Sequence, residues 1–333
     1  MQGGDRLVQE LVKRLPEGQH LIAGYIPRND LTAIAVALYS IVTILLWTNW
    51  YRHGKHRWML ALTCGATCMT IGFFVRIGCH YKPYDLGIYI VSTLFILLSP
   101  CAFLAANYVC LSHIARYLGN DVTTDCLILP ATIIVKFFVI SDITTFLIQA
   151  AGGAMTASGQ ENPSMGEVGR KVSMAGLSLQ LASFATYTVI LLYFGYRVRK
   201  LFPKKWSRGS TVAESDKQAF AWYKVADTTP IAEWRILYFT VCATCIGFLI
   251  RSGFRVSEFK DGYSGYLYTH EGYFYGLDAL PLLISISAYI FVWPPRFLKR
   301  SDLFRDLDRV EEVETQEAKT AKEASKTPSV EMA

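Results

Sequence analysis

Seven long apolar stretches occupy most of the chain. Each is long enough to cross the roughly 30 Å hydrocarbon core of a bilayer as an α-helix, which takes about 20 residues. The stretches are Leu31–Trp50, Trp58–Cys79, Leu86–Leu111, Cys126–Gln149, Val172–Tyr196, Glu233–Phe254 and Tyr273–Trp293. Because irregular backbone and open sheet edges do not face lipid, the pattern predicts an all-α, polytopic bundle of seven transmembrane helices.

Prolines and small residues inside these stretches predict how the helices bend and pack. Three prolines should each kink the helix that contains it, because proline lacks the backbone N–H. They are Pro100, Pro130 and Pro281. On the second span, Ala61, Gly65 and Gly72 recur on one face. Small residues at such spacing let a second helix approach closely, so we expect a tight helix pair there.

The basic residues are unevenly divided between the two sets of connections. Twenty lysines and arginines follow the first, third, fifth and seventh spans, whereas nine lie in the N-terminal segment and the other connections. The positive-inside rule then places the N-terminus outside and the C-terminus in the cytosol. We expect an extracytoplasmic segment at 1–30, a seven-helix domain at 31–293 and a partly disordered cytosolic tail at 294–333.

Composition supports a membrane protein and argues against other classes. The chain is 52 % hydrophobic and 18 % charged, with a mean hydropathy of +0.27. Its net charge of +6 comes from loops that flank the spans, so it reflects topology rather than nucleic-acid binding. We expect the basic fifth connection, about 197–232, to lie against anionic inner-leaflet lipids, and the tail to meet a cytosolic partner. The plasma membrane is the expected location, with vacuolar and other endomembranes as alternatives.

Cysteine and histidine positions predict neither a disulfide framework nor a metal site. Seven of the eight cysteines lie in or beside apolar runs, where a cysteine usually serves as a small packing residue. None is spaced with histidines as zinc ligands are. We therefore expect no structural disulfide, no metal and no cofactor.

Charged and amide side chains inside the spans are the candidate site, because each costs a few kcal/mol in hydrocarbon. The candidates for binding a substrate are Asp142, Gln149, Gln180, Arg251, Arg255, Glu258, Glu271 and Asp278. Nearly all fall in the half of the bundle predicted to face outside. On the fourth span, Lys136 is expected near the middle, Asp142 in the outer third and Gln149 at the rim.

Helical spacing groups these residues further. One face of the fourth span carries Phe138, Asp142, Thr145 and Gln149. A second stripe, on the sixth span, consists of Arg251, Arg255 and Glu258. A third, on the seventh span, consists of Glu271 and Asp278. One interpretation is a buried ion pair, such as Arg251 with Asp278, that only locks helices together. The other is a polar cavity, open toward the outer leaflet, that holds a lipid head group or a cation through the carboxylates of Asp142, Glu271 and Asp278.

Several short motifs on the third to seventh spans resemble those of one family. They are Leu97-Leu98-Ser99-Pro100 and Ala105-Ala106-Asn107-Tyr108; Lys136-Phe137-Phe138-Val139 with Asp142, Phe146, Gln149 and Gly152-Gly153; Gly176-Leu177 with Gln180; Ile250-Arg251 with Arg255 and Glu258; and His270-Glu271, Tyr273, Asp278 and Pro281. With these motifs the chain, over about residues 25–294, resembles the fungal lipid-translocating exporter family of RTA-like proteins.

The resemblance implies a function in lipid movement. Members of that family resemble sphingoid long-chain base exporters and sterol-toxin or azole resistance factors, so it implies a translocator of amphipathic lipids that contributes to stress and drug resistance. The residues expected to support the site are Arg76, Lys136, Tyr108 and Tyr273. Phe254 and Gly276-Leu277 depart from the family pattern, which implies a difference in head-group selectivity.

Other functional classes fit the residues less well. A phosphate-binding loop ending in Gly-Lys-Ser/Thr is absent from the sequence, so we expect no ATPase activity of its own. The seventh span has no lysine for an opsin Schiff base, and the six histidines fall in loops or at span ends, which argues against a membrane hydrolase. A seven-helix receptor that senses lipid or stress and signals through the fifth connection and tail stays open as the alternative.

Overall fold

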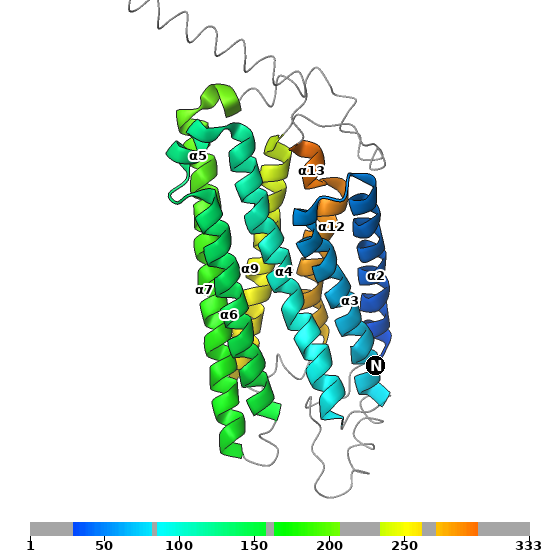
Figure 1. The fold of residues 1–333 in the computed structure, drawn as a ribbon. Helices are drawn as coiled ribbons and strands as arrows, with labels where there is room; N and C mark the ends of the chain where they lie inside the picture. The colour runs from blue at the N-terminus through cyan, green and yellow to red at the C-terminus, as the bar shows by residue number, and fades with distance from the viewer. Residues whose placement is uncertain (1–28, 82–84, 158–162, 207–233, 262–270, 299–333) are drawn as a thin grey trace, which may run out of the picture.

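The computed structural model describes residues 29–81, 85–157, 163–206, 234–261 and 271–298, and these are almost entirely helical (Figure 1). Seven helices are long and apolar enough to cross a membrane, which confirms the predicted fold. In chain order they are α2 (Asn29–Arg52), α3 (Leu60–Tyr81), α4 (Leu86–Leu118), α6 (Ala131–Ala157), α7 (Pro163–Leu201), α9 (Trp234–Asp261) and a composite last helix of α11 (Glu271–Tyr273), η4 (Phe274–Ala279) and α12 (Leu280–Phe291). The 3₁₀ turn η1 (Arg57–Met59) leads into α3, and two short helices, α5 (Asn120–Cys126) and α13 (Pro294–Phe297), lie at one end of the bundle.

The helices form a closed ring in chain order. Each spanning helix packs against the next one, from α2 through α3, α4, α6, α7 and α9 to α12, and α12 packs back against α2. In addition, α4 contacts α9 across the ring. Figure 1 shows the members running side by side along one axis, with α6 and α7 as a long adjacent pair. The first and last spans are therefore neighbours.

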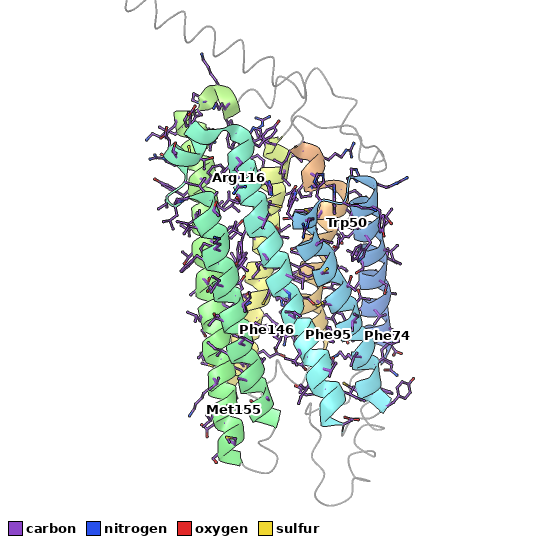
Figure 2. The ribbon with its side chains drawn as sticks, in the orientation of Figure 1. Trp50, Phe74, Phe95, Arg116, Phe146 and Met155 are labelled. Carbon is purple, nitrogen blue, oxygen red and sulfur yellow. The ribbon has the colours of Figure 1, made fainter. Side chains whose placement is uncertain are left out.

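The outer surface of the ring is apolar, as lipid contact requires. Large hydrophobic side chains are exposed along the outer faces of the helices; examples are Ile34, Ile41, Ile44, Ile133, Ile140, Ile143, Leu147, Val189, Leu192 and Ile246. Phe74 on α3 points away from the bundle in Figure 2 and is 67 % exposed. Soluble monomeric proteins rarely expose so much contiguous apolar surface, so the exposure of these side chains agrees with a location in a membrane.

Glycines bring α3 and α4 into close contact, as the small residues of the second span predict. A Cβ on Gly65 would lie 2.9 Å from the Cβ of Ala102, and one on Gly72 would lie 2.8 Å from the Cγ1 of Ile96. The hydroxyl of Ser92 also donates a hydrogen bond to the carbonyl oxygen of Gly72. No larger side chain fits at either glycine without a shift of the helices.

The ends of α6 and α7 differ from the predicted bounds. Pro130 precedes the first residue of α6, and its carbonyl oxygen accepts the N–H of Ile134, so the predicted kink within a helix at Pro130 is wrong. At the other end α6 continues past Gln149 to Ala157, because its small residues pack tightly on α7. A Cβ on Gly152 would lie 2.6 Å from the amide nitrogen of Ser173.

The last spanning helix contains a π-helical segment, η4, directly before Pro281. The N–H of Leu280 bonds to the carbonyl oxygen of Tyr275, five residues earlier, which is the π-helical spacing. Tyr39 on α2 donates its hydroxyl to the carbonyl oxygen of Ala279 at 2.7 Å. This wider turn carries Asp278, and π-helical turns are frequent at functional sites.

Candidate functional site

The central feature of the site is an ion cluster between α9 and η4. Arg255 donates to Asp278 through two bonds, from Nε to Oδ1 at 2.7 Å and from Nη2 to Oδ2 at 2.9 Å. Arg251 also reaches Asp278, with its Nε 3.0 Å from Oδ1. Glu258 pairs with Nη1 of Arg255 at 3.1 Å, one turn further along α9. The ion pair of Arg251 with Asp278, one of the two interpretations of the sequence, is therefore present.

Most of this cluster is buried, although the Arg255 side chain is 15 % exposed. Asp278 is fully buried, and Arg251 is 4 % exposed. The ring of Phe274 lies against the cluster, with the guanidinium carbons of Arg76 and Arg255 at 4.6 and 5.1 Å from its centroid. Both contacts are of the cation–π type, which strengthens when the cation is desolvated. Arg76 is thus brought to the cluster from α3.

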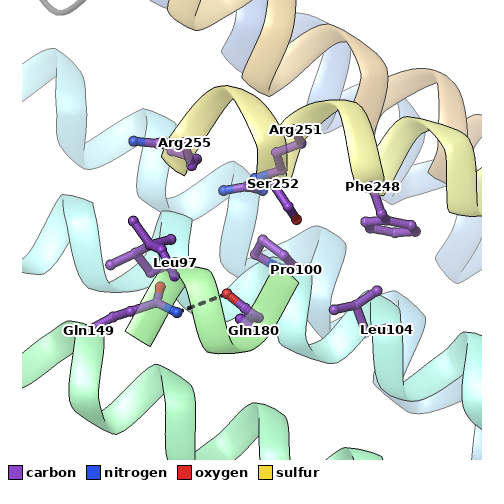
Figure 3. A pocket seen from close by; sticks show the side chains of 10 residues that line it. Leu97, Pro100, Leu104, Gln149, Gln180, Phe248, Arg251, Ser252 and Arg255 are labelled. Atoms are coloured by element: carbon purple, nitrogen blue, oxygen red, sulfur yellow. Dashed lines mark hydrogen bonds between the residues drawn. The ribbon is translucent and has the colours of Figure 1, made fainter. Parts of the chain in front are cut away.

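A small pocket lies beside the cluster, between α4, α6, α7 and α9 (Figure 3). Its polar wall consists of Gln149, Gln180, Arg251, Ser252 and Arg255. Its apolar wall consists of Leu97, Pro100, Leu104, Leu177 and Phe248. The free volume is about 20 Å³, enough for one group of the size of a water molecule. None of the described residues that line it is acidic.

The two glutamines face each other across α6 and α7. The amide nitrogen of Gln149 donates to the side-chain oxygen of Gln180 at 2.9 Å, as drawn in Figure 3. Gly176 makes room for Gln149, because a Cβ there would lie 2.9 Å from the Cγ of Gln149. Gln180 in turn donates to the Sγ of Cys101 at 3.5 Å. These contacts connect the pocket to α4.

Asp142 occupies a separate buried position behind Cys101. The hydroxyl of Tyr108 donates to its Oδ2 at 2.8 Å, and the thiol of Cys101 approaches its backbone carbonyl oxygen at 3.9 Å. Its other oxygen, Oδ1, has no hydrogen-bond partner within the part of the chain that the structure describes. The predicted face of the fourth span, Phe138, Asp142, Thr145 and Gln149, is buried throughout. Asp142 and Asp278 thus contact different neighbours and do not meet directly.

Asn107, one turn after the pocket residue Leu104 on α4, links four helices. Its side-chain nitrogen donates to the hydroxyl of Thr244 at 3.1 Å, and its side-chain oxygen accepts the hydroxyl of Tyr289. Its backbone carbonyl accepts the hydroxyl of Tyr187 at 2.9 Å. A fully bonded buried network of this kind fixes the relative positions of the helices that contribute to it. Here these are α4, α7, α9 and α12.

Some predicted site residues lie elsewhere than expected. Lys136 is in the second turn of α6 with an exposed side chain, so it lies near one end of the helix rather than its middle and does not join the group. Asp142 lies near the middle of α6 rather than its outer third, and Gln149 is buried rather than at a rim. The reason is that α6 begins and ends later than the apolar run. Tyr273, which was expected to support the site, is 38 % exposed and does not line the pocket.

Other predictions stay untested by the geometry. Glu271 is the first residue of α11, and its side chain falls outside the described part of the chain. The segments 1–28, 207–233 and 299–333, which contain most of the predicted N-terminal segment, basic connection and tail, also lie outside it. The helix ring alone does not define which end of the bundle faces outside, so that orientation stays a prediction from the positive-inside rule.

Several residues that form the site were not predicted. Ser252 and Cys101 are small and uncharged, so the cost of a charge in hydrocarbon does not single them out. The apolar wall of the pocket has no sequence signal at all, since leucine and phenylalanine are common throughout the spans. Phe274 could have been found, because it lies one turn from Asp278 and close to the end of the span.

The fold and the pocket define a class: a polytopic α-helical membrane protein whose helix ring encloses a polar, hydrogen-bonding pocket beside an ion cluster. Among the described residues, no three His, Cys, Asp or Glu side chains gather as a metal site would need. The pocket itself places a polar wall next to an apolar one.

Comparison with known proteins places this class in a family. A family model described as RTA1 like protein matches residues 62–301, and the chain belongs to this RTA1-like family. No solved structure is significantly similar to it.

Three yeast relatives, all from Saccharomyces cerevisiae, are similar to the chain. Protein RTA1 is 27 % identical over 231 residues, which cover 69 % of this chain and 63 % of the relative. Protein RTM1 is 22 % identical over 231 residues, with 69 % and 65 % covered. The sphingoid long-chain base transporter RSB1 is 24 % identical over 288 residues, with 80 % and 71 % covered. The chain thus spans slightly less than two thirds of the length of the first two.

Proposed function

We propose that the protein translocates amphipathic lipids across its membrane and has no ATPase activity of its own. The observation that carries this proposal is the pocket, whose polar wall of Gln149, Gln180 and Arg251 faces an apolar wall of leucines and Phe248. A lipid next to its head group offers the same two kinds of surface. The name of the relative RSB1, a sphingoid long-chain base transporter, supports a lipid substrate.

Candidate substrates are sphingoid bases and sterol-like lipids. Both carry hydroxyl oxygens that can accept hydrogen bonds from a guanidinium or an amide, and both have an apolar body that can stay in contact with lipid. Removal of such lipids from one leaflet would protect a cell from toxic lipids and lipophilic drugs. The proposed location is the plasma membrane, with the basic fifth connection on the anionic inner leaflet.

Passage of a head group requires the helices around the pocket to separate. The cavity holds only about 20 Å³, so a complete head group does not fit in the conformation described. The pocket is bounded by α4, α6 and α7 on one side and by α9 on the other. We expect α9 to move relative to these three helices during transport, with movement driven by the lipid gradient or by exchange.

The test is a reconstitution experiment. The purified full chain in liposomes should speed the movement of a labelled sphingoid base or sterol between leaflets, read as label reached by a membrane-impermeant quencher. Gln149→Leu should slow this movement at least tenfold, because it removes a donor from the pocket. The lipid-facing Leu147→Ala, on the same helix and 59 % exposed, serves as the matched control and should leave the rate unchanged. Rates equal to those of protein-free liposomes for every lipid tested would reject the proposal.

A further inference from the structure

The carboxylates of the ion cluster are turned away from the pocket. Both oxygens of Asp278 accept bonds from Arg255, and one of them also contacts Arg251. Glu258 pairs with Arg255. Asp278 is fully buried, and neither carboxylate is among the residues that line the cavity. A cationic head group in the pocket would therefore meet arginines rather than the carboxylates that the sequence suggested for it.

Arg251 presents an unused donor at this place. Its Nε contacts Asp278, but its Nη1 is buried and has no hydrogen-bond partner among the described residues. A buried donor without a partner is costly because it has lost its hydrogen bonds to water, and a charged donor is more costly than a neutral one. Figure 3 shows the side chain extending from α9 into the space shared with Leu97 and Gln180. The pocket therefore lacks an acceptor for a charged donor in its wall.

We propose that the pocket binds lipid head groups through an anionic oxygen, such as that of a phosphate or carboxylate, and disfavours ammonium head groups. This inference rests on the proposed function, because it names the ligand class of the same site. Guanidinium groups form their strongest hydrogen bonds with such oxygens, whereas an ammonium carries only donors and the same charge. The free volume accommodates one oxygen atom at Arg251, with the rest of the head group at the opening.

The neighbours of Arg251 fit this assignment. Asp278 keeps its two bonds to Arg255 when Arg251 turns toward a ligand, so binding does not strand a buried carboxylate. The hydroxyl-bearing Ser252 lies next to Arg251 in the lining and offers a neutral donor. Leu104 and Phe248 provide the apolar surface for the first carbons of the chain. This narrows the candidate substrates named above: the same contacts disfavour the free amine of a sphingoid base and favour a sphingoid base that carries a phosphate.

A matched series of ligands tests the proposal. The full chain, purified in a neutral detergent at pH 7, is heated with an alkyl phosphate, an alkyl alcohol or an alkylamine of one chain length, or with inorganic phosphate. We expect the alkyl phosphate to raise the unfolding temperature most, with an apparent Kd at least tenfold below that of the alkylamine. The alcohol should be intermediate, and inorganic phosphate should be weak because it lacks the chain.

Two variants assign the effect to Arg251. Arg251→Gln should bring the alkyl phosphate and alkyl alcohol to the same apparent Kd. Lys171→Gln is the matched control, because Lys171 is an exposed cation on α7 outside the pocket, and it should retain the preference. If Arg251→Gln does not fold, the ligand series on the unaltered chain still decides.

The contrary outcomes are equally specific. Stabilisation by the alkylamine equal to that by the alkyl phosphate, or no stabilisation by any lipid, would overturn the proposal. An equal shift with inorganic phosphate would assign the site to free anions and overturn its lipid part. Binding in detergent does not require lipid movement between leaflets. A negative result in the ligand series would therefore not reject lipid translocation, and a negative liposome assay would not reject the ligand class proposed here.

Discussion

Arg255 holds both carboxylate oxygens of Asp278, with Nε 2.7 Å from Oδ1 and Nη2 2.9 Å from Oδ2. This two-point contact is the strongest geometry available to an arginine and a carboxylate. Arg251 shares only Oδ1, at 3.0 Å. The two arginines are therefore not equivalent: Arg255 anchors η4 to α9, and Arg251 is the member that can change partner.

The first prediction concerns this difference. Arg255→Gln should lower the free energy of unfolding by about 3–5 kcal/mol, because it leaves Glu258 buried without its partner and removes two bonds from Asp278. Arg251→Gln should cost less, by about 1–3 kcal/mol, since it removes one charged contact. Chemical denaturation in mild detergent measures both, and equal losses would contradict the assigned roles.

Apolar replacement of Arg251 and Asp278 together provides a second prediction. For an isolated buried pair, such a double change largely restores stability. Here it should not, because Arg255 would remain buried with Glu258 as its only carboxylate partner among the described residues. The measurement is the folded fraction in a detergent size profile. Full recovery would show that the pair is independent of Arg255.

The third prediction concerns Tyr108 and Asp142. Tyr108→Phe removes the only side-chain donor that the described residues offer to the buried Asp142 carboxyl, so stability should fall by about 1–3 kcal/mol. Adding Asp142→Leu should recover most of this loss, because no polar group then lacks a partner. Tyr196→Phe, at a position 60 % exposed, is the control and should be neutral. If the double variant is less stable than Tyr108→Phe, the hydrogen bond is not the reason for the loss.

Two adjacent glycines on α6 allow a matched test of helix packing. A Cβ on Gly152 would lie 2.6 Å from the amide nitrogen of Ser173, whereas one on Gly153 would meet nothing within 4 Å. Gly152→Ala should therefore cost about 1–3 kcal/mol through overpacking, and Gly153→Ala should cost nothing. The unfolding temperatures of the two variants test this prediction. A similar loss of stability in both would mean that these positions need the backbone flexibility of glycine rather than space for a helix contact.

The last prediction tests the orientation of the bundle on one helix. Lys171 and Arg199 are exposed residues near opposite ends of α7, roughly 40 Å apart at 1.5 Å per residue. In a background without the native cysteines, Lys171→Cys should react with an impermeant maleimide on intact cells. Arg199→Cys should react only after permeabilisation. The reverse pattern would place the N-terminus in the cytosol.

Much of the fold could be predicted because bilayer thickness fixes helix length and hydrocarbon penalises charge. The apolar runs identified all seven spans, and the cost of Arg251, Arg255 and Asp278 identified the cluster. Helix ends were less predictable, since the small residues after Gln149 carry no strong hydropathy although they continue α6 against α7.

The direction of the side chains was not predictable from the sequence. Charge in a span indicates that a residue is buried, but not which partner it has. The sequence could not decide between two interpretations of Asp278, an ion pair with Arg251 and contact with a ligand; its oxygens are occupied by arginines. The π-helical segment that positions Asp278 also shifts the helical register, so simple spacing from Glu271 does not describe that face.

The ring closure has a consequence for how the protein is made. Asp278 lies 23 residues after Arg255 and belongs to the last span, so the arginines of α9 leave the ribosome before their carboxylate partner does. Until the last helix inserts and packs on α2, the arginines of α9 remain costly in lipid. A chain truncated before this helix should therefore insert α9 less stably than the full chain does, because its arginines lack Asp278 as a partner.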